Sequence, residues 1–231
     1  SHPAVQWDVV LKRMKNVIEK LKSQMEMQLE KCGVCLLRGT AQLIDNHVVR
    51  LIGKDGTRKI RAKKIVLATG SEPRTVSDLP QDSNSIVSSA EFLQSDTLPQ
   101  SFLIVGGGYI GCEFASLCAA FDIPVTIVET ADRLLPSMDR DIGKRLALSL
   151  KRKNVKLYSN DAVLSVEKNE NTCVCRTKAG CEIVAEAILV SVGRVARIDK
   201  EACESCGIEL DGECVAVNPF LETTVSGIYA V

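Results

Sequence analysis

The chain has 231 residues, 45% of them hydrophobic and 25% charged, which is enough for one large domain or two small ones with buried cores. Lys and Arg number 29, as do Asp and Glu, so the net charge is zero and argues against binding to nucleic acid or an anionic membrane. No apolar segment approaches the roughly 20 residues of a membrane span, and no signal-peptide pattern is present. We therefore expect a soluble protein of the cytoplasm or of an organelle matrix or stroma, and not a secreted one.

The first third of the chain predicts a long helix followed by a small antiparallel meander. Apolar residues recur at three- and four-residue steps through residues 7–31, which is typical of an amphipathic helix whose apolar stripe needs a sheet or helix to cover it. Beyond this helix the pattern changes to alternation, with a turn at Asp55-Gly56. The predicted strands cover 34–37, 40–44, 48–52 and 58–60.

Two local signals follow. Residues 65–71 read as a buried strand that runs into Thr69-Gly70-Ser71. Ser88 and Glu91 have the spacing of a capping box, which predicts a short helix at 90–93.

The stretch 102–129 carries the strongest functional signal. It reads FLIVGGGYIGCEFASLCAAFDIPVTIVE, in which Gly106, Gly108 and Gly111 have the G-x-G-x-x-G spacing between an apolar run and a helical pattern. Such a unit turns tightly, brings bare backbone to a pyrophosphate and points a helix N-terminus at it. Glu129 ends the next strand, where a carboxylate accepts hydrogen bonds from the adenosine ribose and repels a 2′-phosphate. We therefore predict an NAD site, which Arg133 would modify if its guanidinium turned toward the ribose.

The second half of the chain continues the alternation of helices and strands. A helix begins at Asp139, and a strand at 155–158 is a candidate for the third parallel strand. A further buried strand at 188–192 ends at Gly193. Between them an antiparallel meander is predicted at 162–167, 172–177 and 182–184. This alternation of helices and strands along the chain predicts an α/β, doubly wound architecture with antiparallel inserts.

The ten cysteines include two C-x-x-C pairs, Cys32/Cys35 and Cys203/Cys206. Each pair has the spacing of half a zinc site or of a dithiol redox centre. Neither follows a strand at a helix N-terminus, where a thiolate is favoured. We interpret most of the cysteines as reduced packing residues and expect no metal site.

Three blocks of the sequence suggest a family. They are IVLATGSEPR at 65–74, GGGYIGCEFAS continuing to ETADRLLP, and LVSVGR followed by LETTVSGIYAV at the C-terminus. In this order they resemble the middle of the FAD-dependent pyridine nucleotide-disulfide oxidoreductases, most closely the dihydrolipoamide dehydrogenase branch. The resemblance implies a Rossmann-type NAD-binding domain at 72–197, inserted between an incomplete FAD-binding domain of the same type at 1–71 and its return segment at 198–231. The chain would then be a central piece of a longer protein.

The resemblance also implies roles for single residues. Tyr109 would stand over the flavin as a gate, although an exposed Tyr109 would serve surface packing equally well. Val163 would contact adenine, although it fits a core position on spacing alone. Glu113 would reach the nicotinamide carboxamide, and Gly193 would pass close to the cofactor. The residues implied to hold the NAD diphosphate are Gly106, Gly107, Gly108, Tyr109, Ile110, Gly111 and Glu113, and those implied to border FAD are Ala41, Thr69, Gly70 and Ser71.

The activity implied for the parent protein is oxidation of a dithiol to a disulfide, with electrons passing through FAD to NAD+. Its partner would be the lipoyl domain of a 2-oxo acid dehydrogenase complex, and the parent would be a homodimer. The chain contains no C-x-x-x-x-C redox pair and no His-Glu acid/base pair of that family, so we expect NAD binding with little or no turnover by the chain itself. The alternatives are an NADH oxidase, a mercuric or coenzyme A-disulfide reductase, or a non-catalytic nucleotide-binding module.

Overall fold

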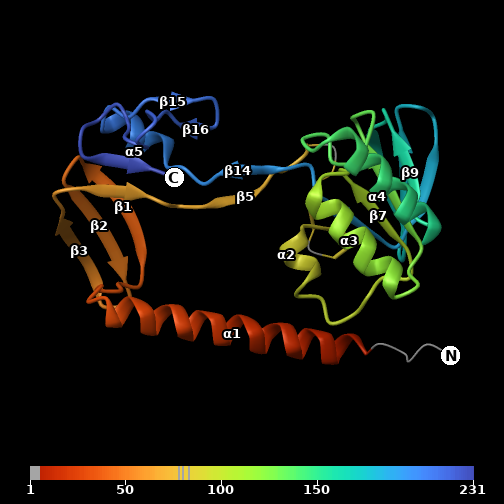
Figure 1. Cartoon of the computed structure of the whole chain (residues 1–231), viewed down its shortest axis with the longest axis horizontal. Coiled ribbons are helices and arrows are strands. Elements are labelled where there is room, and N and C mark those ends of the chain that lie inside the picture. The colour runs from red at the N-terminus through yellow and green to blue at the C-terminus, as the bar shows by residue number, and fades with distance from the viewer. Residues whose placement is uncertain (1–5, 78, 80, 83) are drawn as a thin grey trace. The chain divides into compact units, whose positions relative to one another are not determined.

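The structure, a computed structural model, describes residues 6–77, 79, 81–82 and 84–231 (Figure 1). These residues form two compact units. Unit 1 contains the chain through Ile18 together with Pro73–Gly193, and unit 2 contains Glu19–Glu72 together with Arg194–Val231. Within the described residues, no helix is long and apolar enough to cross a membrane.

A five-stranded parallel sheet forms the centre of unit 1, in the order β6-β13-β7-β8-β9. The chain moves outward from β7 to β8 and β9 on one side, and β13 and β6 lie on the other. The strand order therefore reverses beside β7, which is where folds of this type bind ligands at the carboxyl ends of their strands. The strands are β6 (Ile86–Val87), β7 (Phe102–Val105), β8 (Val125–Glu129), β9 (Lys156–Ser159) and β13 (Ala187–Val190).

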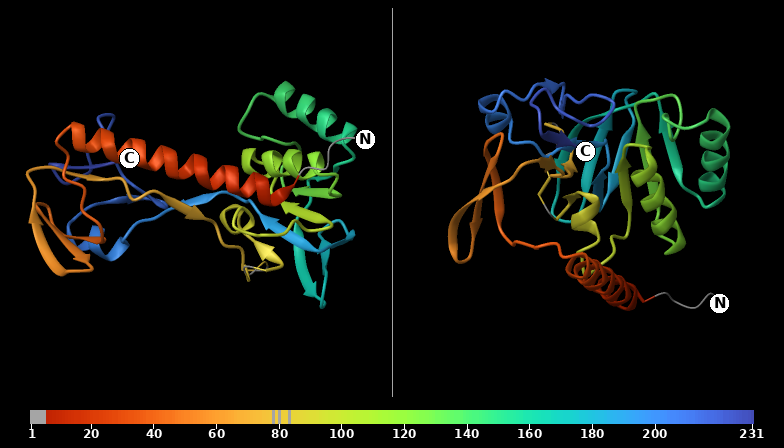
Figure 2. Two further views of the ribbon diagram at one scale, coloured as in Figure 1. Left: turned by 90° about the horizontal axis from the view of Figure 1, so that it is seen from below. Right: turned by 60° about the vertical axis from the view of Figure 1, so that its left-hand side comes forward.

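Alternate side chains of the central strands enter two separate cores. Ile104 and Ile127 pack on one face with helices, whereas Leu103 and Val128 pack on the other face with an antiparallel meander. In the left view of Figure 2 the green helices lie above the sheet and the teal meander lies below it. The predicted α/β Rossmann-type class is confirmed, and the meander takes the place of a second helical layer. The covering elements are α3 (Tyr109–Ala120), α4 (Arg140–Arg152), β10 (Val163–Lys168), β11 (Cys173–Thr177) and β12 (Glu182–Ala185).

The helical face of the sheet also takes in the start of α1 (Trp7–Lys31). Trp7 packs on the ring of Phe92 and donates its indole N–H to the carbonyl of Ser95 at 2.9 Å. Phe92 ends α2 (Ser89–Phe92), whose N-terminus is closed by the predicted capping box of Ser88 and Glu91. Further along α1, the described residues leave several apolar side chains of the predicted stripe exposed. They are Val17, Ile18, Leu21 and Met25.

Unit 2 is built from small sheets. The predicted meander is present as three antiparallel strands, and the segment after it pairs in parallel with the C-terminal strand. A core of Cys203, Ile208 and Ile228 joins these elements. The elements are β1 (Thr40–Asp45), β2 (Val48–Gly53), β3 (Gly56–Arg61), β4 (Ile65–Leu67), β17 (Ile228–Ala230), α5 (Lys200–Ser205), the hairpin β15 (Leu210–Asp211) and β16 (Cys214–Val215), and the pair β5 (Ser71–Pro73) and β14 (Arg194–Ala196).

Two predicted strands differ from the structure. Residues 34–37 form no strand, because α1 ends at Lys31, the chain turns at Gly33 with a φ of 70°, and the next residues find no pairing partner among the described strands. Val34, Leu36 and Leu37 remain exposed. The strand expected at 65–71 stops at Leu67, and its central Val66 is 59% exposed, so it is a short strand with one open face.

Candidate dinucleotide-binding site

A cavity of about 390 Å³ opens in unit 1 at the carboxyl ends of the parallel strands. Its walls come from the glycine-rich loop between β7 and α3, from the end of β8, and from the segments after β9 and β13. Most of the predicted NAD-site residues come together here. The predicted residues that line the cavity are Gly106, Gly108, Tyr109, Ile110, Glu129, Val163 and Gly193.

The three spaced glycines meet different surroundings. Gly106 has a φ of 105°, and a Cβ on it would lie 2.5 Å from the carbonyl oxygen of Ser191. A Cβ on Gly111 would overlap the carbonyl oxygen of Gly106, so this glycine lets α3 pack closely against the strand. A Cβ on Gly108 would meet nothing within 4 Å and would point into open space. Gly106 and Gly111 therefore shape the loop, and Gly108 leaves room for a ligand.

Helix α3 presents its N-terminus to this space. The helix has 12 residues, its N-cap is Gly108, and no side chain caps it. The first N–H groups of a helix have no partner within the helix and carry partial positive charge. This end of α3 can therefore hold an anionic diphosphate.

Glu129 is the only acidic residue of β8, and it is 7% exposed. One carboxylate oxygen accepts the N–H of Gly107 at 2.5 Å, and the other accepts the N–H of Ala131 at 2.7 Å and the hydroxyl of Thr130 at 3.1 Å. A carboxylate has about four acceptor sites. These three hydrogen bonds occupy three of the sites on Glu129, which leaves one for a ligand hydroxyl. Glu129 thus anchors the glycine loop and also lines the cavity.

The loop is held by further contacts that the sequence did not reveal. The Ser191 hydroxyl lies 3.0 Å from the carbonyl oxygen of Val105 and 3.1 Å from that of Gly106, so its single O–H is shared between the two acceptors. The Cys112 thiol donates to the carbonyl of Gly107 at 3.4 Å. Burial, together with the nearby carboxylates of Glu129 and Glu113, raises the pKa of Cys112 to about 11, so the thiol keeps its proton. A serine or cysteine in an apolar run gives no sequence signal for such a role.

Asp161 is a second buried carboxylate in the cavity wall and was not predicted. It is 4% exposed, and one oxygen accepts the N–H groups of Ala162 and Ala179 at 2.8 and 2.9 Å. Burial alone would raise the pKa of Asp161, but the Thr177 hydroxyl and these N–H groups outweigh it and hold the pKa below its ordinary value. Asp161 therefore remains ionised and fixes the turn between β9 and β10.

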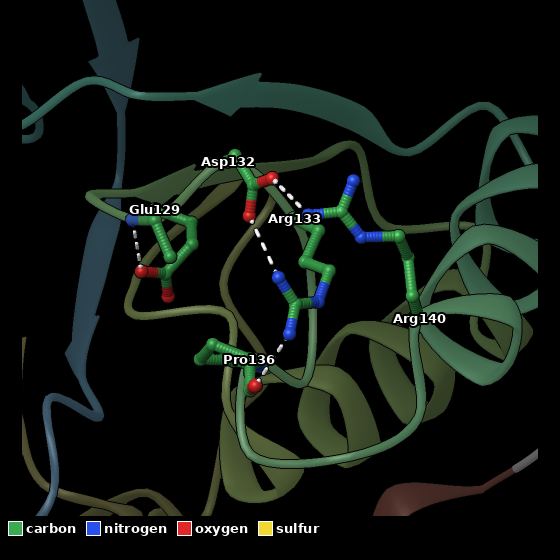
Figure 3. A network of polar contacts seen from close by, with 6 residues as sticks. Glu129, Asp132, Arg133, Pro136 and Arg140 are labelled. Atoms are coloured by element: carbon green, nitrogen blue, oxygen red, sulfur yellow. Dashed lines mark hydrogen bonds and ion pairs between the residues drawn. The ribbon is translucent and has the colours of Figure 1, made fainter.

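Arg133 lies beside the cavity and is engaged elsewhere. Its guanidinium donates to the Asp132 carboxylate at 3.0 Å and to the carbonyl of Pro136 at 2.8 Å, as Figure 3 shows. The turn of Arg133 toward the ribose that the sequence left open is therefore not seen. Pro136 itself lines the cavity.

The remaining predicted residues lie outside this cavity. Gly107, in the loop, and Gly111, in the first turn of α3, are buried, and Glu113 is exposed on α3. In unit 2, Ala41, Thr69 and Gly70 line an apolar cavity of about 590 Å³. Ser71 does not line this cavity; its hydroxyl and carbonyl accept hydrogen bonds from Arg194 at 2.8 and 2.6 Å.

The two C-x-x-C pairs differ in their surroundings. Cys32 and Cys35 are exposed after the C-terminal end of α1, while Cys203 is buried and Cys206 is half-buried. Burial raises the pKa of Cys203 and of Cys206, which favours the thiol form. All ten cysteines are free, and no group of three metal-binding side chains occurs in the part of the chain that the structure describes. Besides the two in the first pair, Cys214 is exposed, so packing does not explain every cysteine.

Comparisons with known proteins find relatives that are similar in sequence and in fold. The dihydrolipoyl dehydrogenase of Bacillus subtilis is 30% identical over 98% of this chain and 50% of its own length, and that of Pseudomonas aeruginosa is 32% identical over 93% and 46%. The solved structure of LpdA from Mycobacterium tuberculosis superimposes with a TM-score of 0.91 at 26% identity, covering 98% of this chain and 51% of that one. The flavoprotein disulfide reductase RclA from Escherichia coli gives a TM-score of 0.88 at 28% identity, covering 98% and 52%.

The chain thus spans about half the length of the curated relatives it matches. Residues 2–231 match the sequence pattern of the pyridine nucleotide-disulphide oxidoreductases, which is essentially the whole chain. The chain belongs to the pyridine nucleotide-disulphide oxidoreductase family.

Proposed function

We propose that unit 1 binds NAD(H) in the cavity at the ends of β7 and β8. The observation that carries the proposal is the buried Glu129 carboxylate, which lines the cavity and bonds to the glycine loop at the same time. The dinucleotide diphosphate would lie at the N-terminus of α3, over the space that Gly108 leaves open. The adenosine ribose would donate to Glu129, and Val163 would contact the adenine.

Homologues in this family use FAD together with NAD or NADP. We propose that Ala41, Thr69 and Gly70 of unit 2 form part of the FAD site. The fit rests on the apolar lining of that cavity and on Gly70, whose φ of 74° and open surroundings suit close approach of a ligand to the backbone. When bound, FAD supplies the two-electron redox chemistry, and residues of this chain bind and orient the two cofactors. Tyr109, which is 64% exposed at the cavity, would act as a gate that moves aside when NAD(H) enters.

For the whole protein we propose the activity of a dihydrolipoyl dehydrogenase, in which a dithiol is oxidised to a disulfide and NAD+ accepts the electrons. The names of the curated relatives support this activity. The lipoyl domain of a 2-oxo acid dehydrogenase complex would be the partner, and the protein would act as a homodimer. Ten free cysteines suit a reducing compartment, namely the cytoplasm or an organelle matrix.

A disulfide reductase is the second candidate. The structural likeness to RclA favours it, because that protein is a flavoprotein disulfide reductase. The dithiol substrate, and the direction in which electrons pass, separate this candidate from a dihydrolipoyl dehydrogenase.

The NAD site is tested by titrating NADH and NADPH into the chain and into the variant Glu129→Gln. Wild type should bind NADH more tightly than NADPH. The substitution keeps the shape of the side chain but replaces a charged acceptor with a neutral amide, so NADH binding should weaken by about 1–2 kcal/mol. Equal affinity of wild type for the two nucleotides, or no effect of Glu129→Gln, would refute the assignment of Glu129 to the ribose.

A further inference from the structure

Two cysteines just after α1 differ from most of the others in their surroundings. Cys32 and Cys35 are exposed, whereas most of the other cysteines are buried or half-buried. A reduced cysteine usually lies in a protein interior, where it packs as a small apolar side chain. Packing therefore does not explain this C-x-x-C pair, and neither thiol lines the cavity of the proposed NAD(H) site.

The backbone forms a tight cap at the end of α1. The N–H of Gly33 donates to the carbonyl of Glu30 at 2.9 Å, and the N–H of Val34 donates to that of Leu29 at 2.9 Å. Gly33 has a φ of 70°, which the left-handed position of such a cap requires. Cys32 directly precedes this glycine, and its own N–H still bonds back into the helix at 3.0 Å. The cap therefore fixes the backbone of Cys32 to the last turn of α1.

The segment after the cap is tied back to the same end of the helix. The Val34 N–H is held by the last turn of α1, and the Arg38 guanidinium pairs with the Glu26 carboxylate on the same helix. Cys35 lies in the sequence between these two anchors. It is therefore held beside the last turns of α1, where Cys32 also lies.

Little in the surroundings opposes a bond between the two sulfur atoms. A Cβ placed on Gly33 would meet nothing within 4 Å, and residues 34–37 form no strand that would have to break. A disulfide needs a Cα separation of about 5.5–6 Å, to which a free connecting segment can adjust. The second C-x-x-C pair differs, because Cys203 is buried and burial raises the pKa of both Cys203 and Cys206. Reagents in solution therefore reach the first pair more easily than the second.

We propose that Cys32 and Cys35 are a thiol modification site, which exchanges with low-molecular-weight disulfides to form a reversible intrachain disulfide. In the first step, the thiolate of one cysteine attacks the small disulfide, and one small thiol leaves. In the second step, the thiolate of the other cysteine attacks the protein sulfur of this mixed disulfide, and the second small thiol leaves. The pair gives up two electrons and two protons, and the small disulfide that accepts them becomes two thiols. Neither step uses FAD or NAD(H), so the inference is independent of the proposed function.

The experiment equilibrates the folded full chain with oxidised and reduced glutathione, blocks free thiols with iodoacetamide in denaturant and analyses tryptic peptides by mass spectrometry. Trypsin cleaves after Lys31 and Arg38, so the peptide 32–38 contains both cysteines of the pair and no other. With reduced glutathione at about 0.1 mM, the second thiol of the pair has a higher effective concentration, in the millimolar range, and should displace bound glutathione. The peptide with an intrachain disulfide should therefore exceed the peptide with bound glutathione by at least about tenfold. Dithiothreitol should restore both thiols.

Two variants and one change of conditions serve as controls. Cys35→Ser should accumulate a mixed disulfide of Cys32 with glutathione, because the second step is lost. Cys214→Ser should behave as wild type, since Cys214 is also exposed but lies far along the chain from the pair. In wild type unfolded by urea, the excess of the intrachain form should fall at least about threefold, because the cap and the ion pair of Arg38 with Glu26 are lost.

Three results would overturn the proposal. They are recovery of the folded wild-type peptide with both thiols alkylated, accumulation of bound glutathione without ring closure, and an excess of the intrachain form in urea equal to that in the folded chain.

Discussion

Gly108, the N-cap of α3, and Gly111, in the first turn of that helix, lie three residues apart and predict opposite outcomes of substitution. A side chain on Gly108 would enter open space at the cavity, and its φ of −71° is accessible to any residue. A side chain on Gly111 would collide with the backbone of Gly106. The first glycine therefore serves the ligand and the second serves the fold.

We predict that Gly108→Val leaves unit 1 folded and abolishes NADH binding, because the added methyl groups occupy the space for the diphosphate. Gly111→Ala should instead destabilise unit 1 by about 1–3 kcal/mol through overpacking. Trp7, which is the only tryptophan of the chain and packs in the core of unit 1, reports unfolding by its fluorescence. Urea unfolding and NADH titration of both variants check the pair. NADH binding of wild-type strength in Gly108→Val would contradict the site.

Only some of the residue contacts in the site could be predicted from the sequence. The spacing of the glycines and Glu129 could be read from the sequence because the chemistry of a diphosphate and a ribose demands those residue types. The hydrogen bond from Gly107 to Glu129, and the bonds of Ser191 to the loop, could not, because they join segments 22 and 85 or more residues apart. Such contacts depend on the packing of β7, β8 and β13.

At the scale of the elements, the side chain of Asp82 binds the backbone at the start of edge strand β6. Asp82 accepts the N–H groups of Asn84, Ser85 and Ile86 at 3.0, 2.9 and 2.8 Å, and its other oxygen pairs with Lys168 on β10 at 2.7 Å. It thereby joins the start of β6 to the meander. Burial alone would raise the pKa of Asp82, but the contact with Lys168 and the three N–H groups outweigh it and lower the pKa to about 2.

This pKa predicts a dependence of stability on pH. The folded value of about 2 lies below the roughly 3.9 of an unfolded aspartate, so the stabilisation is present above about pH 5 and is lost as the pH falls toward 2. We predict that Asp82→Asn lowers the free energy of unfolding of unit 1 by about 1–3 kcal/mol at pH 7, and that the difference shrinks toward zero near pH 2.

Urea unfolding followed by Trp7 fluorescence at several pH values measures the difference. Glu170→Gln, an exposed carboxylate on the β10–β11 turn, is the control and should have little effect at any pH. If Asp82→Asn lowers the free energy of unfolding by the same amount at pH 7 and pH 2, the charge of Asp82 is not the cause of the destabilisation.

The elements that the sequence predicted well are those whose pattern and partners are both local. The strand-glycine-helix-strand unit and the capping box of Ser88 fall in this class, and each agrees with the structure to within a residue or two. The apolar run at 34–37 predicted a strand, but a strand needs a hydrogen-bonding neighbour, and the described strands offer none there. Whether an apolar run forms a strand is decided by its partner, which its own residues do not specify.

At the scale of the whole molecule, the two units have separate cores and separate cavities. The sequence predicted a nucleotide-binding segment at 72–197, and the compact unit contains Pro73–Gly193 together with the start of α1. The sequence could not predict that the start of α1 belongs to this unit. Its place there depends on the packing of Trp7 and Leu11 with α2 and α3, which lie far along the chain. The proposed site for the pyridine nucleotide is built from residues of unit 1 alone.

Hydrogen-deuterium exchange of the full chain with and without saturating NADH is the sharpest test of this placement, because it locates the ligand on the backbone. Binding to unit 1 should slow exchange in the glycine loop and first turn of α3 at 106–112, after β8 at 129–136, and at 191–193 after β13. The meander at 40–61 and the C-terminal segment at 200–231 should exchange at unchanged rates. Protection in unit 2, or no protection around 106–112 at saturation, would contradict a pyridine nucleotide site in unit 1.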